Sequence, residues 1–429
     1  MSCCNTTAKG DTVADETSDP NVFEEIVSPI MDLLEHSPEP YSGDAETYTL
    51  SFQPFLLNML FGIINGHSTV GLIVTQIASS QVARTLKLVQ SSKTGYHEAF
   101  HRYGPEQYRC LFAALLKSVA FMAIPELQSL GPIYLVDGSV FPAISSMVWA
   151  QYQKNHNAIK LHLCFNLNHM IPVQFLSTHA KWSERKFLRS IIEKGITYIC
   201  DRGYASFAIF HEIVEKSASF IMRGKNDMVF SVVSALPLVI PVNLSGLMTV
   251  AYDVKAVFKN DPHKREYRIV SFVAGHESYL LITNRFELTT YQIIMLYAYR
   301  WQIELIFRLL KRTMKGLHLM VQHPKGIETQ FYLYMIAYLL LLSFKQKCAS
   351  SRKPNSSSCG TQTASDVQSI KHANDSGPTD IKSSGRLFVC GLVSMLGERL
   401  REYWKLGLHW LTRMRNSLAM PARLAIAAL

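Results

Sequence analysis

Short apolar stretches alternate with amphipathic ones between residues 133 and 224, and each is about as long as one strand or one helix. Alternation of apolar and polar residues predicts strands, whereas apolar residues that recur every three or four positions predict helices. In chain order the pattern predicts three strands, a helix, a strand, a helix and a strand, at residues 133–144, 159–167, 170–178, 183–194, 196–203, 206–217 and 218–224. This part of the chain is therefore expected to be an α/β unit.

The same order of elements is typical of a ribonuclease-H-like fold, which needs one further helix. That helix is delayed, because residues 225–288 are rich in Val, Tyr, Phe and Thr and predict a β-rich insertion. Strands are expected within it at residues 248–258, 267–274 and 278–284. A single long helix should then run from Thr289 to Gly316, since Thr favours a helix start and Gly a helix end.

Charge is spread unevenly over the 429 residues. The formal net charge is +10, yet the first 47 residues hold eleven acidic residues and one lysine, which leaves +20 on the rest. A positive charge of this size on residues 48–429 suits binding to a polyanion such as nucleic acid, although excess Lys and Arg can also serve solubility alone. Charge by itself does not decide between these two interpretations.

The segments outside the α/β unit differ in composition. Apolar stretches at residues 55–64, 67–89 and 105–120 each predict a helix, so residues 46–128 are expected to form a helical domain. This domain is interpreted either as a DNA-end-binding domain or as a plain helical cap. The acidic start is expected to be largely disordered, apart from a short amphipathic helix at Phe23–Leu34. The predicted organisation is 1–45 acidic N-terminus, 46–128 helical domain, 129–224 first part of the core, 225–288 β-rich insertion, 289–348 final core helices, 349–386 Ser-rich linker or insert, and 387–429 C-terminal helical segment.

A membrane role is disfavoured by the longest apolar run, Phe331–Phe344. It is shorter than the about 20 residues that span a bilayer, so it predicts a buried helix. The polar, acidic start is not typical of a secretory signal. None of the eight cysteines forms the C-x-x-C pair found in many zinc sites, and a reducing cytosol is the expected compartment.

Three carboxylates are placed by this pattern where they can meet. Asp137 is expected at the end of the first strand and Asp201 at the end of the fourth, and these strands are neighbours in the predicted order. Glu304 lies on the long helix that packs across them. A single Asp at a strand end is most often a turn former, but three such groups supply the hard oxygen ligands that two divalent metal ions require.

A basic stripe accompanies Glu304 on the long helix. It comprises Tyr297, Arg300, Glu304, Arg308, Lys311 and Lys315. Four of these follow the pattern Y-x2-R-x3-E-x6-K and fall within about 60° of one another at about 100° per residue. One interpretation is a metal-binding carboxylate flanked by cations that hold phosphates. The other is a solvated charged face with a Glu–Lys pair, which the apolar residues on the opposite sides of the helix make less attractive.

These motifs resemble those of DDE transposases of the bacterial insertion sequence 4 family. The resemblance rests on YLVDGS around Asp137, YICDRGY around Asp201 and YAYRWQIELIFRLLK from Tyr297 to Lys311, and covers roughly residues 50–345. It implies a ribonuclease-H-like catalytic core with a β insertion and two Mg²⁺ or Mn²⁺ ions. It also implies cut-and-paste action on double-stranded DNA, at terminal inverted repeats and at a target, by a homodimer on two DNA ends. The bacterial cytoplasm, at the nucleoid when DNA is bound, is the implied location.

The resemblance also implies roles for individual residues. Asp137, Asp201 and Glu304 would be the catalytic metal ligands, and Tyr297, Arg300 and Lys311 would contact DNA phosphates near the scissile bond. Further candidates for DNA contact are Arg308 and Lys315 on the stripe and Arg202 beside Asp201. His162 could approach the metals, but a core histidine is the favoured interpretation. Glu184 is either a capping carboxylate at a helix start or a neighbour of the active site.

Two other functions use the same residues. A nuclease on the same fold would cut DNA without joining it, and a transposase-derived protein could bind DNA without catalysis. The Y-x2-R-x3-E-x6-K pattern favours transposition over cutting by a nuclease. The presence of all three acidic residues argues against a DNA-binding protein without catalysis.

Overall fold

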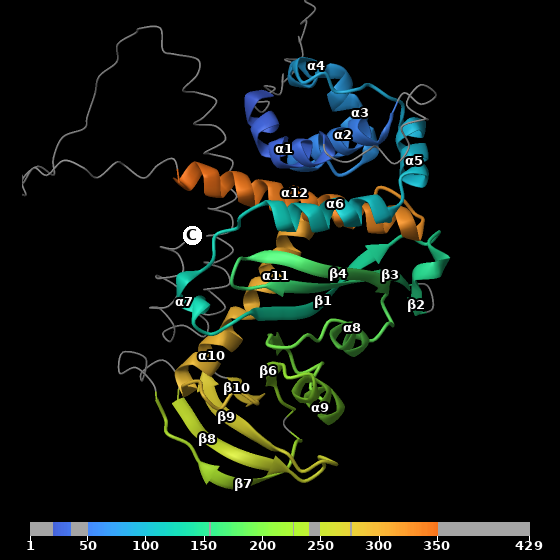
Figure 1. Cartoon of the computed structure of the whole chain (residues 1–429). Coiled ribbons are helices and arrows are strands. Elements are labelled where there is room, and N and C mark those ends of the chain that lie inside the picture. Colours follow the sequence, from blue (N-terminus) through green and yellow to red (C-terminus); the bar gives the residue numbers. More distant parts are fainter. Residues whose placement is uncertain are drawn as a thin grey trace, which may run out of the picture.

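The structure is a computed structural model that describes residues 20–35, 50–153, 156–225, 227–239, 249–274 and 277–350. The predictions for the rest of the acidic N-terminus, for nearly all of the Ser-rich segment and for the C-terminal helical segment lie outside the described residues. The described residues form a mixed α/β structure around one large sheet (Figure 1).

Ten strands make up the sheet in the part of the chain that the structure describes. They are β1 (Ile133–Ala143), β2 (Gln151–Gln153), β3 (His156–Asn166), β4 (Ile171–His179), β5 (Thr197–Cys200), β6 (Ser219–Arg223), β7 (Phe230–Ala235), β8 (Thr249–Phe258), β9 (Glu266–Ala274) and β10 (Glu277–Thr283). The order is β2-β3-β1-β5-β6-β10-β9-β8-β7, and β4 pairs with β3. β1, β5 and β6 are parallel, whereas β3 runs antiparallel to β1 and β4 antiparallel to β3.

The strands of the predicted insertion extend this sheet. β10 pairs antiparallel with β6, for example at Ile282 and Met222, and β9, β8 and β7 follow outward. The three strands expected between residues 248 and 284 are all present, while β2 and β7 were not predicted. Period-two alternation identifies a strand but not its partner, so the sequence pattern did not show that both groups of strands share one sheet.

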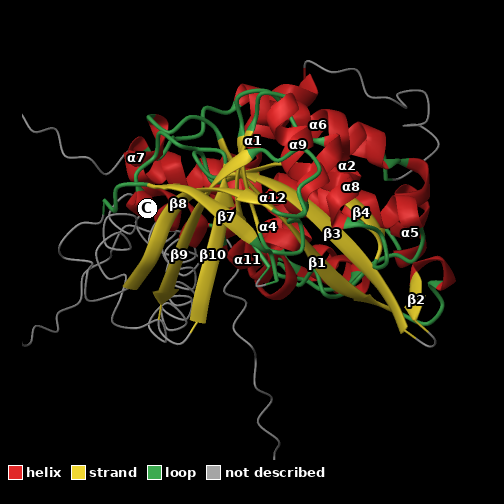
Figure 2. Cartoon of the chain, turned by 90° about the horizontal axis from the view of Figure 1, so that it is seen from below, coloured by secondary structure: helices red, strands yellow, loops and turns green. Residues whose placement is uncertain are grey.

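Helices cover both faces of the sheet (Figures 1 and 2). They are α1 (Pro20–Glu35), α2 (Phe52–Ile64), α3 (Val70–Ser79), α4 (Gln81–Thr85), α5 (Lys93–Arg102), α6 (Pro105–Ser118), α7 (Pro125–Gln128), α8 (Glu184–Ser190), α9 (Phe207–Glu215), α10 (Thr290–Tyr299), α11 (Trp301–Arg308) and α12 (Pro324–Ser350). One hydrophobic core joins the N-terminal helices, α10, α11 and α12 to one face of the strands around β1. A second core packs α8 and α9 on the other face.

A break at Ser80 divides the segment 67–89, which its apolar pattern had predicted as one helix. Ser80 has extended backbone angles (φ −73°, ψ 129°), and its Oγ accepts a hydrogen bond from the Ala83 N–H at 3.3 Å. The hydroxyl thereby caps α4, since a serine side chain satisfies an N–H group at a helix start. The prediction of a continuous helix was wrong because a capping serine competes locally with helix propagation.

The long helix α12 lies between the N-terminal helices and the sheet (Figure 1). Its segment Pro324–Cys348 is long and apolar enough to cross a membrane, but 83% of its apolar window is buried inside the protein. Phe331 and Phe344 are both buried, so the predicted core helix is confirmed. The prediction that this helix is too short to span a membrane was wrong, because the helix extends beyond the apolar run at both ends. Its burial, and not its length, identifies it as a core helix.

Candidate active site

Asp137 and Asp201 occupy equivalent places on neighbouring parallel strands. The last register pair of β1 with β5 is Val136 with Cys200, and the two aspartates follow directly. β5 ends there, but β1 continues to Ala143 because its pairing with β3 continues. The expectation that Asp137 ends its strand was therefore wrong, although it does mark the end of the parallel β1–β5 pairing.

Alternation along the two strands sets the direction of both side chains. Leu135 and Ile199 belong to the core that contains α10 and α11, whereas Val136 and Cys200 belong to the opposite core. Since successive side chains of a strand point to opposite faces, the residues after Val136 and Cys200 return to the face of Leu135 and Ile199. Asp137 and Asp201 therefore face the helices that carry Glu304.

Glu304 stands on a helix that is interrupted near its middle. Thr289 and Gln292 form a capping box at the start of α10, as the Thr in the sequence suggested. The helix then breaks at Arg300, and α11 is followed by a π-helical turn at Leu309–Thr313. The single regular helix predicted from 289 to 316 was wrong, so the angular positions calculated for the last residues of the stripe do not hold.

Arg300 and Tyr297 bring the three carboxylates into one cluster. Arg300 Nη2 donates to Glu304 Oε1 at 2.7 Å, and Arg300 Nη1 lies 3.8 Å from Asp137 Oδ2. Tyr297 Oη donates to Asp201 Oδ1 at 3.2 Å. Tyr297 is buried and the Arg300 side chain is only 14% exposed. This half of the stripe is therefore part of a partly buried, mutually paired cluster, and a solvated row of charges does not describe it.

Burial and neighbouring charges shift the pKa of ionisable groups in the cluster. Burial raises the pKa of Asp137 to about 6; Arg300 opposes this shift, while the charges of Glu304 and Glu184 add to it. Burial also raises the pKa of Glu304, with Arg300 lowering it and Asp201 raising it. For Arg300 burial acts to lower the pKa, but Tyr297 and the surrounding carboxylates outweigh it and raise the pKa. The carboxylates are therefore close together in a partly buried place, and an additional cation would stabilise their charged forms.

The donor set suits a divalent ion. Asp137, Asp201 and Glu304 supply carboxylate oxygens, which are the ligands that Mg²⁺ and Mn²⁺ prefer. Burial is the main cause of the raised pKa of Asp137 and of Glu304, and the charges of neighbouring carboxylates add to it; a bound cation would offset both effects. Among the described residues no three His, Cys, Asp or Glu side chains are grouped closely enough to hold a metal ion. The guanidinium of Arg300 occupies the position of countercharge between Asp137 and Glu304.

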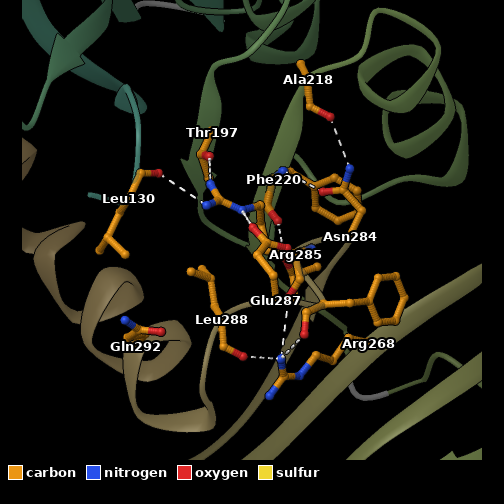
Figure 3. A network of polar contacts seen from close by, with 12 residues as sticks. Leu130, Thr197, Ala218, Phe220, Arg268, Asn284, Arg285, Glu287, Leu288 and Gln292 are labelled. Atoms are coloured by element: carbon orange, nitrogen blue, oxygen red, sulfur yellow. Dashed lines mark hydrogen bonds and ion pairs between the residues drawn. The ribbon is translucent and has the colours of Figure 1, made fainter. Parts of the chain in front are cut away.

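A network of arginines anchors the start of α10 (Figure 3). Arg285 bonds to the hydroxyl of Thr197 and donates to the carbonyl of Leu130 at 3.2 Å. Arg268 bonds to the carbonyl of Leu288 and donates to that of Phe286 at 3.1 Å. The segment that leads into α10 is thereby fixed to the sheet, which in turn positions the cluster farther along the helix.

The other cations of the stripe lie apart from the carboxylates or at their margin. Lys311 Nζ donates to the carbonyl of Val140 at 2.7 Å and lies 4.8 Å from the centre of the Phe141 ring. Arg308 is half-buried, and its charge lowers the pKa of Glu304. Lys315 is exposed, with φ 57°, beyond the π-helical turn. Lys315 thus does not share the helical face predicted for it.

Arg202 lies beside Asp201 but points to a different surface feature. It is exposed and, with Gly203, Lys225 and Asp227, lines an open pocket of about 480 Å³. The pocket follows the carboxyl ends of β5 and β6, which place Arg202 and Lys225 on neighbouring loops. Two cations in an open pocket next to the cluster are compatible with the predicted contact to DNA.

His162 is a core residue, as favoured from the sequence. It is fully buried, Nε2 lies 3.0 Å from Thr178 Oγ1, and its ring packs at 5.0 Å from that of Trp182. Burial lowers the pKa of His162 to about 4, and Lys160 adds to the effect. It belongs to the face of β3 that packs near α8, so it does not join the carboxylate cluster.

Two residues near Glu184 were not singled out from the sequence. Lys160 Nζ donates to Glu184 Oε1 at 3.1 Å, and Arg185 Nε donates to the carbonyl of Gly203 at 3.0 Å. The alternation of β3 does place Lys160 on the same face as His162, but no local pattern links it to Glu184. Ser183 precedes α8 without a side-chain capping bond, and the carboxylate of Glu184 forms an ion pair with Lys160.

Known proteins that resemble this chain are named as transposases. Residues 128–340 match the sequence profile of the family described as Transposase DDE domain. A Sinorhizobium fredii protein named as transposase y4zB is 30% identical over 215 residues, covering 48% of this chain and 59% of that protein. A Geobacillus stearothermophilus protein described as a probable transposase for insertion sequence element IS5377 is 22% identical, covering 49% of this chain and 56% of its own length.

A third relative and one solved structure are also similar. The relative is a Synechocystis protein named as a transposase for insertion sequence element IS4SA, 24% identical over 49% of this chain and 59% of that protein. The structure is the piggyBac transposase synaptic complex with hairpin DNA, with a TM-score of 0.36 and 9% identity over 81% of this chain and 84% of that chain. The chain thus spans less than two thirds of the length of the curated relatives it matches.

The matched segment contains the whole cluster, from Asp137 to Glu304, and the basic residues that follow it. Residues 128–340 are thus similar to the DDE transposase domain family, and the curated relatives that this chain matches are named as transposases.

Proposed function

We propose that the chain is a DNA transposase that cuts at terminal inverted repeats of its own element and joins the 3′ ends to target DNA. The observation that carries the proposal is the cluster in which Arg300 contacts Asp137 and Glu304 while Tyr297 contacts Asp201. The match to the Transposase DDE domain family supports the reaction class, and the cut-and-paste course is what the resemblance to insertion-sequence transposases implies.

We further propose that the core has a ribonuclease-H-like fold. The strands β4-β3-β1-β5-β6 are adjacent in this order, with β3 the one that runs antiparallel to both of its long neighbours. β1, β5 and β6 are parallel; α8 leads from β4 into β5 and α9 connects β5 to β6, both on one face of the sheet. This topology supports the assignment, and β7–β10 would be the insertion that extends the sheet.

Asp137, Asp201 and Glu304 are the proposed ligands of two Mg²⁺ or Mn²⁺ ions, which when bound would activate the attacking hydroxyl and stabilise the leaving oxygen. The remaining groups prepare the site. Arg300 neutralises Asp137 and Glu304 while they are buried together. Tyr297 orients the Asp201 carboxylate through its hydroxyl. The cluster is partly buried, which strengthens these interactions relative to those in bulk water.

Double-stranded DNA is the proposed partner, both as terminal repeats and as target. The +20 formal charge outside the first 47 residues suits the phosphate backbone. We propose that Tyr297, Arg300 and Lys311 contact phosphates near the cut, with Arg202, Arg308 and Lys315 farther out. The helical domain of residues 46–128, which holds α2–α7, is proposed to bind the DNA ends. A homodimer would hold two ends together in the cytoplasm, at the nucleoid.

The test is a reaction with the purified chain, Mg²⁺ or Mn²⁺, a duplex carrying the inverted repeats that flank its gene, and a supercoiled target plasmid. Cleavage at the repeat end followed by covalent joining of the 3′ end is the expected result. Cleavage without joining would instead identify a nuclease. Binding of the repeat without cleavage in either metal would indicate a DNA-binding derivative, and both outcomes would overturn the proposal.

Lys311→Ala should slow cleavage even when binding is saturated. Lys311 is anchored on β1 through Val140, three residues beyond Asp137, so a phosphate held there would align the strand with the carboxylates. Loss of one phosphate contact should also lower the salt dependence of binding by about one unit. The measurement is the single-turnover cleavage rate at saturating protein, compared with the exposed neighbour Arg312→Ala. A wild-type rate for Lys311→Ala would exclude the phosphate contact.

A further inference from the structure

Glu184 lies against the backbone beside both aspartates. A Cβ built on Gly138 would be 3.0 Å from Glu184 Oε1, and one built on Gly203 would be 3.6 Å from Glu184 Oε2. Gly138 directly follows Asp137, and Gly203 is two residues after Asp201. The two oxygens of one carboxylate therefore face the two segments that carry the aspartates, and the absence of a side chain at Gly138 makes room for this approach.

Glu184 reaches this place from the opposite side of the sheet to Glu304. α8 packs through Phe187 and Leu188 into the second core, whereas α11 packs into the first. β5 ends at Cys200. Because this strand does not continue, α8 can approach the end of the parallel β1–β5 pairing from its own face of the sheet. Glu184 and Glu304 consequently flank Asp137 and Asp201 from the two faces of the sheet.

The start of α8 is tied to the segment after Asp201. Arg185 donates to the carbonyls of Gly203 at 3.0 Å and Ala205 at 3.4 Å. The Glu184 carboxylate itself is paired with Lys160, and the two side chains are only 29% and 17% exposed. A partly buried carboxylate next to other carboxylates is electrostatically unfavourable unless it is paired, which Lys160 accomplishes here.

We propose that Glu184 is a fourth acidic residue of the divalent-cation site, which adds negative charge from the α8 side and is balanced by Lys160 when no cation is bound. The inference rests on the proposed function, because it assumes that Asp137, Asp201 and Glu304 take the cation. Glu184 acts as a positioning residue: it lies against both the Asp137 and the Asp201 segment and raises the attraction for the ion. Lys160 acts in the opposite direction.

The experiment measures Mn²⁺ binding to the full chain without DNA, from the loss of the free-ion electron paramagnetic resonance signal. Glu184→Gln should weaken Mn²⁺ binding by about tenfold or more, as replacement of outer groups around metal sites does. Lys160→Met should tighten it, because the opposing charge is removed. Glu212→Gln is the matched control, since Glu212 forms a comparable ion pair with Arg189 between α8 and α9, and should bind as the wild type does.

The direction of the Lys160→Met effect separates this role from a purely structural ion pair. If both Glu184→Gln and Lys160→Met weaken Mn²⁺ binding, the pair only supports the fold and the inference is overturned. If Asp137→Asn weakens binding while Glu184→Gln does not, the inference fails and the proposed cation site stands. If the wild-type chain takes up no Mn²⁺, or Asp137→Asn binds like the wild type, the proposed site and the inference fall together. Circular dichroism confirms that each variant is folded.

Discussion

Asp201→Asn is expected to reduce DNA strand cleavage by at least about a thousandfold while binding of the terminal-repeat duplex is retained. A metal-bound site contributes several kcal/mol to the transition state, and each 1.36 kcal/mol corresponds to about a factor of ten in rate. Asn has nearly the same shape as Asp and can still accept the hydrogen bond from Tyr297, so the loss would reflect the missing charge. Asp137→Asn and Glu304→Gln should behave in the same way.

Cleavage is measured in single-turnover reactions with Mg²⁺, and binding by gel shift with the same duplex. Glu215→Gln serves as the control, because Glu215 is an exposed carboxylate at the end of α9 that pairs weakly with Arg265. Retention of more than a few per cent of wild-type cleavage by any one of the three variants would remove that residue from the site. Loss of cleavage in the control would show that the assay responds to general charge.

The direction and neighbourhood of both aspartates could be predicted from the sequence. The strand pattern places Asp137 and Asp201 on adjacent parallel strands, and the structure adds that they follow the same register pair. The Y-x2-R-x3-E-x6-K pattern likewise brought Tyr297, Arg300 and Glu304 to one side of a helix, where they do contact the aspartates or each other. Local periodicity was sufficient because these residues lie within one or two helical turns or directly after the last register pair of β1 with β5.

Other features depend on contacts that local patterns do not encode. β1 extends past Asp137 because β3 continues to pair with it, and the β7–β10 strands join the main sheet through β6. The π-helical turn after Arg308 redirects Lys311 toward Val140 and leaves Lys315 outside the helix. The approach of Glu184 to Gly138 and Gly203 likewise needs the packing of α8 against the sheet. Each of these is a long-range or packing effect.

Asp253→Ala is expected to be the most destabilising of the substitutions considered, at about 3–5 kcal/mol of unfolding free energy. Asp253 and Arg268 form an ion pair whose side chains are 0% and 3% exposed. Arg268 Nε and Nη2 donate to the two oxygens of Asp253 at 2.9 and 2.6 Å, and Thr290 donates to Oδ2 at 2.7 Å. Removal of the carboxylate would leave the charge of Arg268 buried without its partner.

The same two strands provide a matched control. Glu266 pairs with Lys255 at 3.0 Å, also between β8 and β9, but these side chains are 47% and 35% exposed. Because exposed ion pairs contribute about 0–1 kcal/mol, Glu266→Gln should cost little. The measurement is the change in unfolding free energy in urea, with both variants compared to the wild type. Since Thr290 begins α10, Asp253→Ala should also weaken the anchoring of the helix that carries Glu304. Similar small losses for both variants would show that the Asp253–Arg268 pair does not hold α10 against the sheet.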